Sequence, residues 1–198
     1  MSVDRRRILL PVSFVAALAS LALLQGADVP GPADPAAFSR RPEPGSFPDQ
    51  WINGVDCGTE PIAQVHAYND DFYIIRQSAC DIFEAPFIYM IFGTERVLVL
   101  DTGAGGTWGV AATVGEVYND WLLRKGLDPI PLIVAHTHSH FDHTAGDNQF
   151  NGLPNVSVVA PNMASMIDFW GFQDFPNDTV QFDLGGGRVL DVLSLIHI

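Results

Sequence analysis

The feature that most constrains this chain is a histidine-rich segment placed directly after an apolar run. Residues 130–135 read Ile-Pro-Leu-Ile-Val-Ala, and residues 136–143 hold four histidines and an aspartate. Imidazole and carboxylate groups at this density suit a borderline cation such as Zn²⁺. The fold must deliver these side chains from the end of a buried strand, which predicts a metal site where a strand passes into a loop.

One register within this segment has a spacing that can bring metal ligands together: His138, His140, Asp142 and His143. In an extended chain alternate side chains point the same way, so His138 and His140 are expected to face one ion. A turn into a helix would direct Asp142 and His143 toward a second ion nearby. Asp142 could also hold or orient a water as a general base. His136 precedes this register, and we expect it to be a supporting or a structural residue rather than a metal ligand.

A second apolar run, residues 97–100, ends in Asp101-Thr102-Gly103, about thirty-five residues before the histidine register. Its continuous apolar character predicts a strand that is covered on both faces. Asp101 has two interpretations. It caps the turn that follows, or it accepts a hydrogen bond from a ligand imidazole and fixes the tautomer of that ring.

Together these two motifs resemble the signatures of the metallo-β-lactamase superfamily, whose members are mostly metal-dependent hydrolases. The resemblance covers residues 65–192. It implies an α/β (α+β) fold, namely the N-terminal half of a metallo-β-lactamase-type αββα sandwich, truncated. It also implies a binuclear zinc centre with His138, His140, Asp142 and His143 as ligands, Asp142 as the catalytic residue, and Asp101 as a support for a ligand. A complete member has a second half with three further ligands, and we expect that half to be missing here.

The resemblance leaves three function classes open. The first is a zinc hydrolase that uses a metal-activated water on an amide or lactam, a lactone or an ester. The second is an iron-dependent oxidoreductase of the persulfide dioxygenase type, and the third is a noncatalytic metal-binding domain. His140 argues against flavodiiron-type oxidoreductases, and Asp142 argues against a purely structural zinc site. We favour a hydrolase with a small-molecule substrate, and we expect the 198-residue chain alone to be inactive.

The N-terminal region predicts export. Three arginines at positions 5–7 precede an apolar run over residues 8–24, so residues 1–27 resemble a secretory signal. The run is either part of a cleaved signal peptide or a retained membrane anchor, and both place the domain outside the cytoplasm, as a periplasmic, secreted or membrane-anchored protein. Residues 28–50 carry six prolines and predict a tether. The folded domain is expected over residues 51–192, followed by a non-native tail at 193–198 in which His197 is not assigned as a ligand.

Charge and cysteine content add two expectations. The formal net charge is −13, and because residues 1–27 hold three Arg and one Asp, the rest of the chain carries −15. A body this acidic repels phosphate backbones, so we expect no nucleic-acid partner. The two cysteines, Cys57 and Cys80, form a disulfide or are two independent buried thiols, and export favours the disulfide.

Hydrophobic periodicity predicts strands that are followed by alternating helices and strands. Strands are predicted at 71–77, 87–92, 96–100, 130–135, 156–160, 179–184 and 188–192, and helices at 108–125, 142–150 and 162–170. Gly126, after a basic pair, is expected to end the first helix. An aromatic group near the last helix either packs as core, which we favour, or forms a lid over the cleft; its members are Phe169, Trp170, Phe172 and Phe175.

Overall fold

The computed structural model describes residues 44–195 of the chain. The predicted export segment, most of the predicted tether and His197 lie outside the described residues. Within residues 44–195, we find no helix with both the length and the apolar character needed to cross a membrane.

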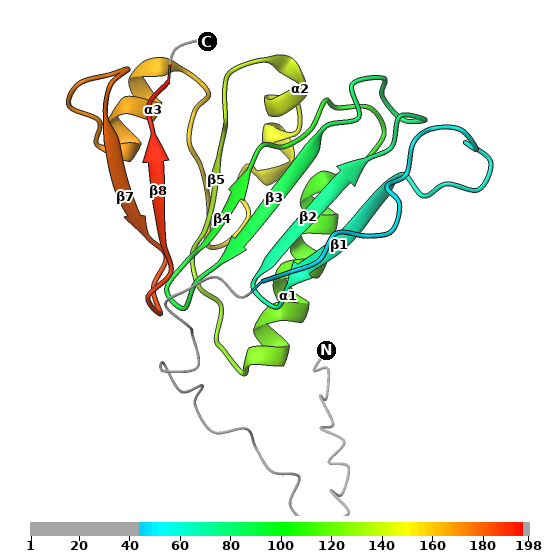
Figure 1. Cartoon of the computed structure of the whole chain (residues 1–198), viewed down its shortest axis with the longest axis horizontal. Helices are drawn as coiled ribbons and strands as arrows, with labels where there is room; N and C mark the ends of the chain where they lie inside the picture. The colour runs from blue at the N-terminus through cyan, green and yellow to red at the C-terminus, as the bar shows by residue number, and fades with distance from the viewer. Residues whose placement is uncertain (1–43, 196–198) are drawn as a thin grey trace, which may run out of the picture. The chain divides into compact units, whose positions relative to one another are not determined.

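Six strands form one mixed sheet in the order β1-β2-β3-β4-β5-β6 (Figure 1). The antiparallel part contains β1 (Ala63–Asn69), β2 (Phe72–Gln77), β3 (Phe87–Phe92) and β4 (Val97–Leu100), and the parallel part adds β5 (Leu132–Ala135) and β6 (Val156–Val158). Strands β2 to β6 begin and end close to their predicted positions. Strand β1 was not predicted, because it is an edge strand without a buried residue and reads Ala-Gln-Val-His-Ala-Tyr-Asn, which lacks the continuous run of large apolar residues seen in β3, β4 and β5.

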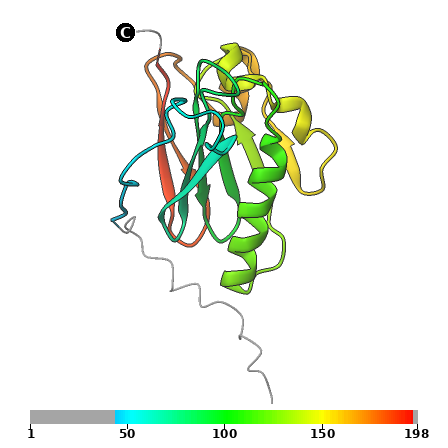
Figure 2. The ribbon, with the colours of Figure 1, turned by 90° about the vertical axis from the view of Figure 1, so that its right-hand side faces the viewer.

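Helix α1 (Val110–Lys125) connects β4 to β5 and covers one face of the sheet (Figure 2). As predicted, the helix ends at Gly126, whose φ of 65° is in the left-handed region that favours glycine. The core on this side combines sheet and helix residues, including Ile75, Met90, Phe92, Val114 and Trp121.

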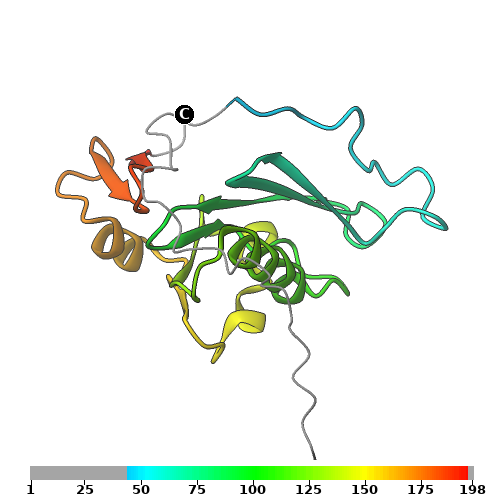
Figure 3. The same cartoon turned by 90° about the horizontal axis from the view of Figure 1, so that it is seen from below.

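The opposite face of β4 and β5 packs against α3 (Met163–Trp170) and the hairpin of β7 (Thr179–Asp183) and β8 (Val189–Leu193). Figure 3 shows this helix and hairpin together at one side of the sheet. Val97 and Val99 belong to the α1 core and Leu98 to the second core, so the predicted double cover of this strand is confirmed. The aromatic group at 169–175 also lies in the second core, which confirms its interpretation as core.

The parallel register of β4 and β5 explains why the two sequence motifs meet. Leu100 is paired with Ala135, so the chain leaves the two strands side by side at Asp101 and His136. The backbone N–H of Asp101 continues the ladder by donating to the carbonyl oxygen of Ala135 at 2.8 Å. Loops after the carboxyl ends of parallel strands are the usual place for a binding site in such sheets.

Ordered contacts extend beyond residues 51–192 on both sides. Ser46 donates its backbone N–H to the carbonyl oxygen of Tyr68 on β1, and Ser194 donates to that of Asp178. A disulfide joins Cys57 to Cys80, with the two Cα atoms 5.3 Å apart. This disulfide ties the segment before β1 to the loop that follows β2.

Candidate metal centre

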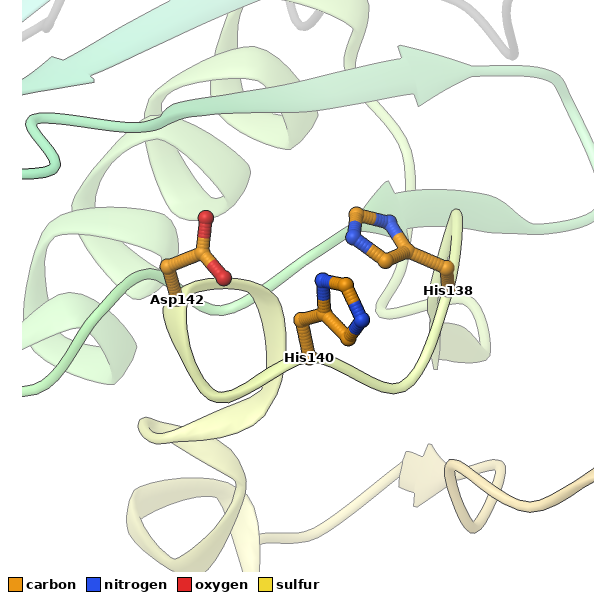
Figure 4. A group of neighbouring side chains, drawn as sticks. All are labelled: His138, His140 and Asp142. Atoms are coloured by element: carbon orange, nitrogen blue, oxygen red, sulfur yellow. The ribbon is translucent and has the colours of Figure 1, made fainter. Parts of the chain in front are cut away.

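Three of the predicted ligands converge on one point. His138, His140 and Asp142 come from a single loop that runs from the end of β5 into the short helix α2 (Phe141–Thr144) (Figure 4). Each offers one ligand atom, and these atoms all lie within 4.8 Å of one another. His140 is exposed and the other two are half-buried, so the group is accessible from solvent.

The fourth predicted ligand, His143, stands beside this group. Its ring centroid is 4.0 Å from that of His138, and its Nε2 is 3.2 Å from Oδ2 of Asp142. The two expected pairs thus lie side by side: Asp142 is next to His143 and is also grouped with His138 and His140. The helix begins at Phe141, and its first turn carries Asp142 back toward the two histidines.

Asp101 supports this loop through hydrogen bonds to two of its residues. Asp101 is 1% exposed, and its Oδ2 lies 2.8 Å from Nδ1 of His143. It also accepts hydrogen bonds from the backbone N–H and the hydroxyl of Thr137. The φ of Asp101 is 69°, a left-handed conformation that is uncommon for any residue except glycine. These contacts orient the His143 ring and anchor the start of the loop.

The hydrogen bonds also show which nitrogen of His143 is available to an ion. Because Nδ1–H donates to Asp101, Nε2 carries the lone pair, and this lone pair faces the Asp142 carboxylate at 3.2 Å. Two acceptors this close repel each other unless a proton or a cation lies between them. Three imidazoles and one carboxylate are a donor set that zinc commonly takes in proteins. The residues present therefore fit a metal ion.

The environment of His138 favours its neutral form. Burial lowers the pKa of His138 below its usual value of 6.5, and the neighbouring imidazoles of His143 and His140 lower it further. The carboxylates of Asp101 and Asp142 act in the opposite direction but do not reverse the shift. A neutral imidazole at pH 7 has the free lone pair that metal binding requires.

Comparison with known proteins identifies the family. The model of the metallo-β-lactamase superfamily matches residues 82–195, a segment that contains Asp101 and all four predicted ligands. The chain belongs to the metallo-β-lactamase superfamily. Members of this superfamily are mostly hydrolases and generally bind metals, and the mixed sheet with its helices is consistent with part of the superfamily fold. Among curated proteins no match to this chain was found.

A further carboxylate supports the glycine-rich loop of this superfamily domain. Asp81 accepts hydrogen bonds from the backbone and hydroxyl of Thr107, both at 2.7 Å, and from the side chain of Gln77 at 2.8 Å. Burial raises the pKa of Asp81, but these bonds outweigh it and hold the pKa below the usual value of 3.8. Gln77 also accepts from the N–H of Ala104.

Sequence reasoning missed several supporting residues of the superfamily site. Asp81 and Gln77 contact residues 26 and 27 positions away, so no local pattern marks them. Asp147 was also missed, because its partners His136 and Thr102 lie 11 and 45 residues earlier. His136 itself is buried against Asp147, which fits the supporting role expected for it.

Proposed function

We propose that this chain carries the metal-binding half of a zinc-dependent hydrolase. One observation carries the proposal: the ligand atoms of His138, His140 and Asp142 converge within 4.8 Å at the end of β5. A zinc ion bound there supplies a Lewis acid that polarises a carbonyl or phosphoryl oxygen and lowers the pKa of a water toward about 7.

The side chains of the site divide the remaining work. His138, His140 and His143 provide the neutral nitrogen ligands. Asp142 is half-buried at the edge of the group, where its carboxylate can accept a proton from a water or orient that water. The water oxygen would add to the carbonyl carbon of an amide or lactam, a lactone or an ester, and the C–N or C–O bond would break as the proton taken from the water passes to the leaving nitrogen or oxygen. Asp101 keeps the proton of His143 on Nδ1 and leaves Nε2 for the ion.

The context of the reaction is part of the same proposal. We propose a binuclear centre, a small-molecule substrate and no nucleic-acid partner, the last because the chain after residue 27 carries a charge of −15. The signal-like residues 1–27 support an extracytoplasmic location, with or without anchoring through residues 8–24. Substrates met outside the cytoplasm, including β-lactams, are therefore favoured.

The test is metal analysis of the purified full-length protein, followed by a panel of hydrolase substrates. We expect about two zinc ions per chain, and loss of about one ion in His138→Ala and in His140→Ala. The matched control, Asp178→Ala, removes a carboxylate that accepts hydrogen bonds from the backbone N–H groups of Gln173, Asp174 and Thr179, away from the metal centre. Unchanged metal content in both histidine variants would overturn the proposal, and iron in place of zinc would favour the dioxygenase-type activity.

A further inference from the structure

The first histidine of the segment, His136, has an environment unlike that of the four ligands. Its side chain is fully buried, and its Nε2 lies 2.9 Å from Oδ1 of Asp147. Its Nδ1 is also buried and has no hydrogen-bond partner among the described residues. A proton on Nδ1 would be an unsatisfied buried donor, so the ring carries its proton on Nε2 and donates it to Asp147.

Asp147 connects this ring to the neighbouring strand. The same Oδ1 accepts a hydrogen bond of 2.7 Å from the hydroxyl of Thr102, the residue after Asp101. The backbone N–H of Thr102 in turn donates to the carbonyl oxygen of His143 at 2.8 Å. One carboxylate oxygen thus joins the end of β5, the loop after β4 and the 3₁₀ helix η2 (Asp147–Phe150).

The backbone just before Asp147 is packed closely against the loop after β4. Gly146 precedes Asp147, and a Cβ at this position would lie 2.3 Å from the carbonyl oxygen of Thr102 and 2.6 Å from Val110. Backbone this close to backbone leaves little freedom for η2 to shift. The loop of residues 137–145, which contains all four predicted ligands, is therefore fixed at one end by His136 and at the other by Asp147.

We propose that His136 and Asp147 are positioning residues of the metal centre, which set the distance between the two ends of its ligand loop. The inference rests on the proposed metal centre and extends it to a pair that touches no metal. Its action differs from that of Asp101, which contacts the ligand His143 directly. Loss of the buried pair lets the ends of the loop separate, and the ligand atoms no longer converge without reorganisation.

The experiment compares Zn²⁺ affinity and the visible absorption spectrum with Co²⁺ for the wild-type full-length protein and four variants. In Asp147→Ala and His136→Leu, we expect Zn²⁺ affinity to fall about tenfold, with a changed Co²⁺ spectrum. In His136→Gln, whose amide N–H can still donate to Asp147, most of the affinity should return. Asp178→Ala, the control, should leave affinity and spectrum unchanged. Thermal unfolding of the metal-free proteins measures stability separately.

Three results would overturn the inference. If Asp147→Ala and His136→Leu lower only the unfolding temperature and bind both ions as the wild type does, the pair is merely structural. If those variants do not fold, Asp147→Leu, which keeps a branched side chain but offers no hydrogen-bond acceptor, replaces them, and wild-type affinity and spectrum in it would have the same meaning. A wild-type protein that binds neither ion would instead overturn the proposed metal centre and this inference with it.

Discussion

At the scale of single residues, the two carboxylates of the site have different surroundings. Asp142 is half-buried and lies among the imidazole groups, within 4.8 Å of the nearest ligand atoms of His138 and His140. Asp101 is 1% exposed, and its oxygens are occupied by Thr137 and His143. The first is placed to bind an ion, and the second is placed to orient a residue that does.

The different surroundings predict different costs for the same substitution. Asp101→Asn should lower zinc affinity by about 10–100-fold, the range typical for partners of metal ligands. Asp142→Asn should lower it further, because it removes a charged ligand. Competition with a chromophoric chelator measures both values. If Asp101→Asn proved as severe as Asp142→Asn, Asp101 would have to be reassigned as a direct ligand.

At the scale of elements, the site depends on how closely the segment after α2 approaches the loop after β4. Ala145 donates its backbone N–H to the carbonyl oxygen of Gly103 at 3.1 Å, and Gly146 packs against Thr102 without space for a side chain. By contrast, Gly115 in the middle of α1 has no atom within 4 Å of the position where its Cβ would lie. Close packing therefore requires a glycine at position 146 but not at position 115.

Alanine at these two glycines should change stability in opposite directions. Gly146→Ala should lower the free energy of unfolding by about 2 kcal/mol, because the new Cβ meets backbone that cannot move aside. Gly115→Ala should raise it by up to about 1 kcal/mol, because alanine has the higher helix propensity and meets no obstacle. Urea denaturation of the two variants tests this. Equal midpoints would show that the junction at Gly146 relaxes freely.

At the scale of the whole described domain, one carboxylate connects elements that are far apart in the sequence. Asp71 lies in the turn between β1 and β2. It accepts a hydrogen bond of 3.0 Å from Trp121 and forms an ion pair of 2.9 Å with Lys125, both on α1. It also pairs at 3.2 Å with Arg188, 117 residues later in the turn of the β7–β8 hairpin. The Asp71 carboxylate thus links the sheet to α1 and to the β7–β8 hairpin.

This connection predicts that Asp71→Asn destabilises the domain more than loss of an exposed ion pair does. The Arg188 and Asp71 side chains are only 12% and 14% exposed, so the variant leaves a poorly hydrated cation. We expect a loss of about 2 kcal/mol, somewhat less than for a fully buried pair. The control is Glu95→Gln. The side chains of Glu95 and Arg96 are 67% and 38% exposed, so their ion pair should contribute about 0.5 kcal/mol or less to the free energy of unfolding. Thermal unfolding that ranked the two variants equally would contradict this.

The sequence by itself determined the local elements and the chemistry of the site. Strand β3 was predicted with its observed bounds, and α1 with its end at Gly126, because apolar periodicity and helix-ending residues are local signals. The density of histidines after β5 predicted the candidate metal ligands for a similar reason, since ligand type and spacing are written in neighbouring positions.

Only the tertiary structure decided which groups meet. The parallel register of β4 and β5 places Asp101 beside the histidine loop, and the turn into α2 brings Asp142 close to His138 and His140 as well as to His143. Asp147 and Asp81 were missed for one physical reason. Each is defined by hydrogen bonds to residues distant in the chain, and periodicity along the sequence carries no record of such contacts.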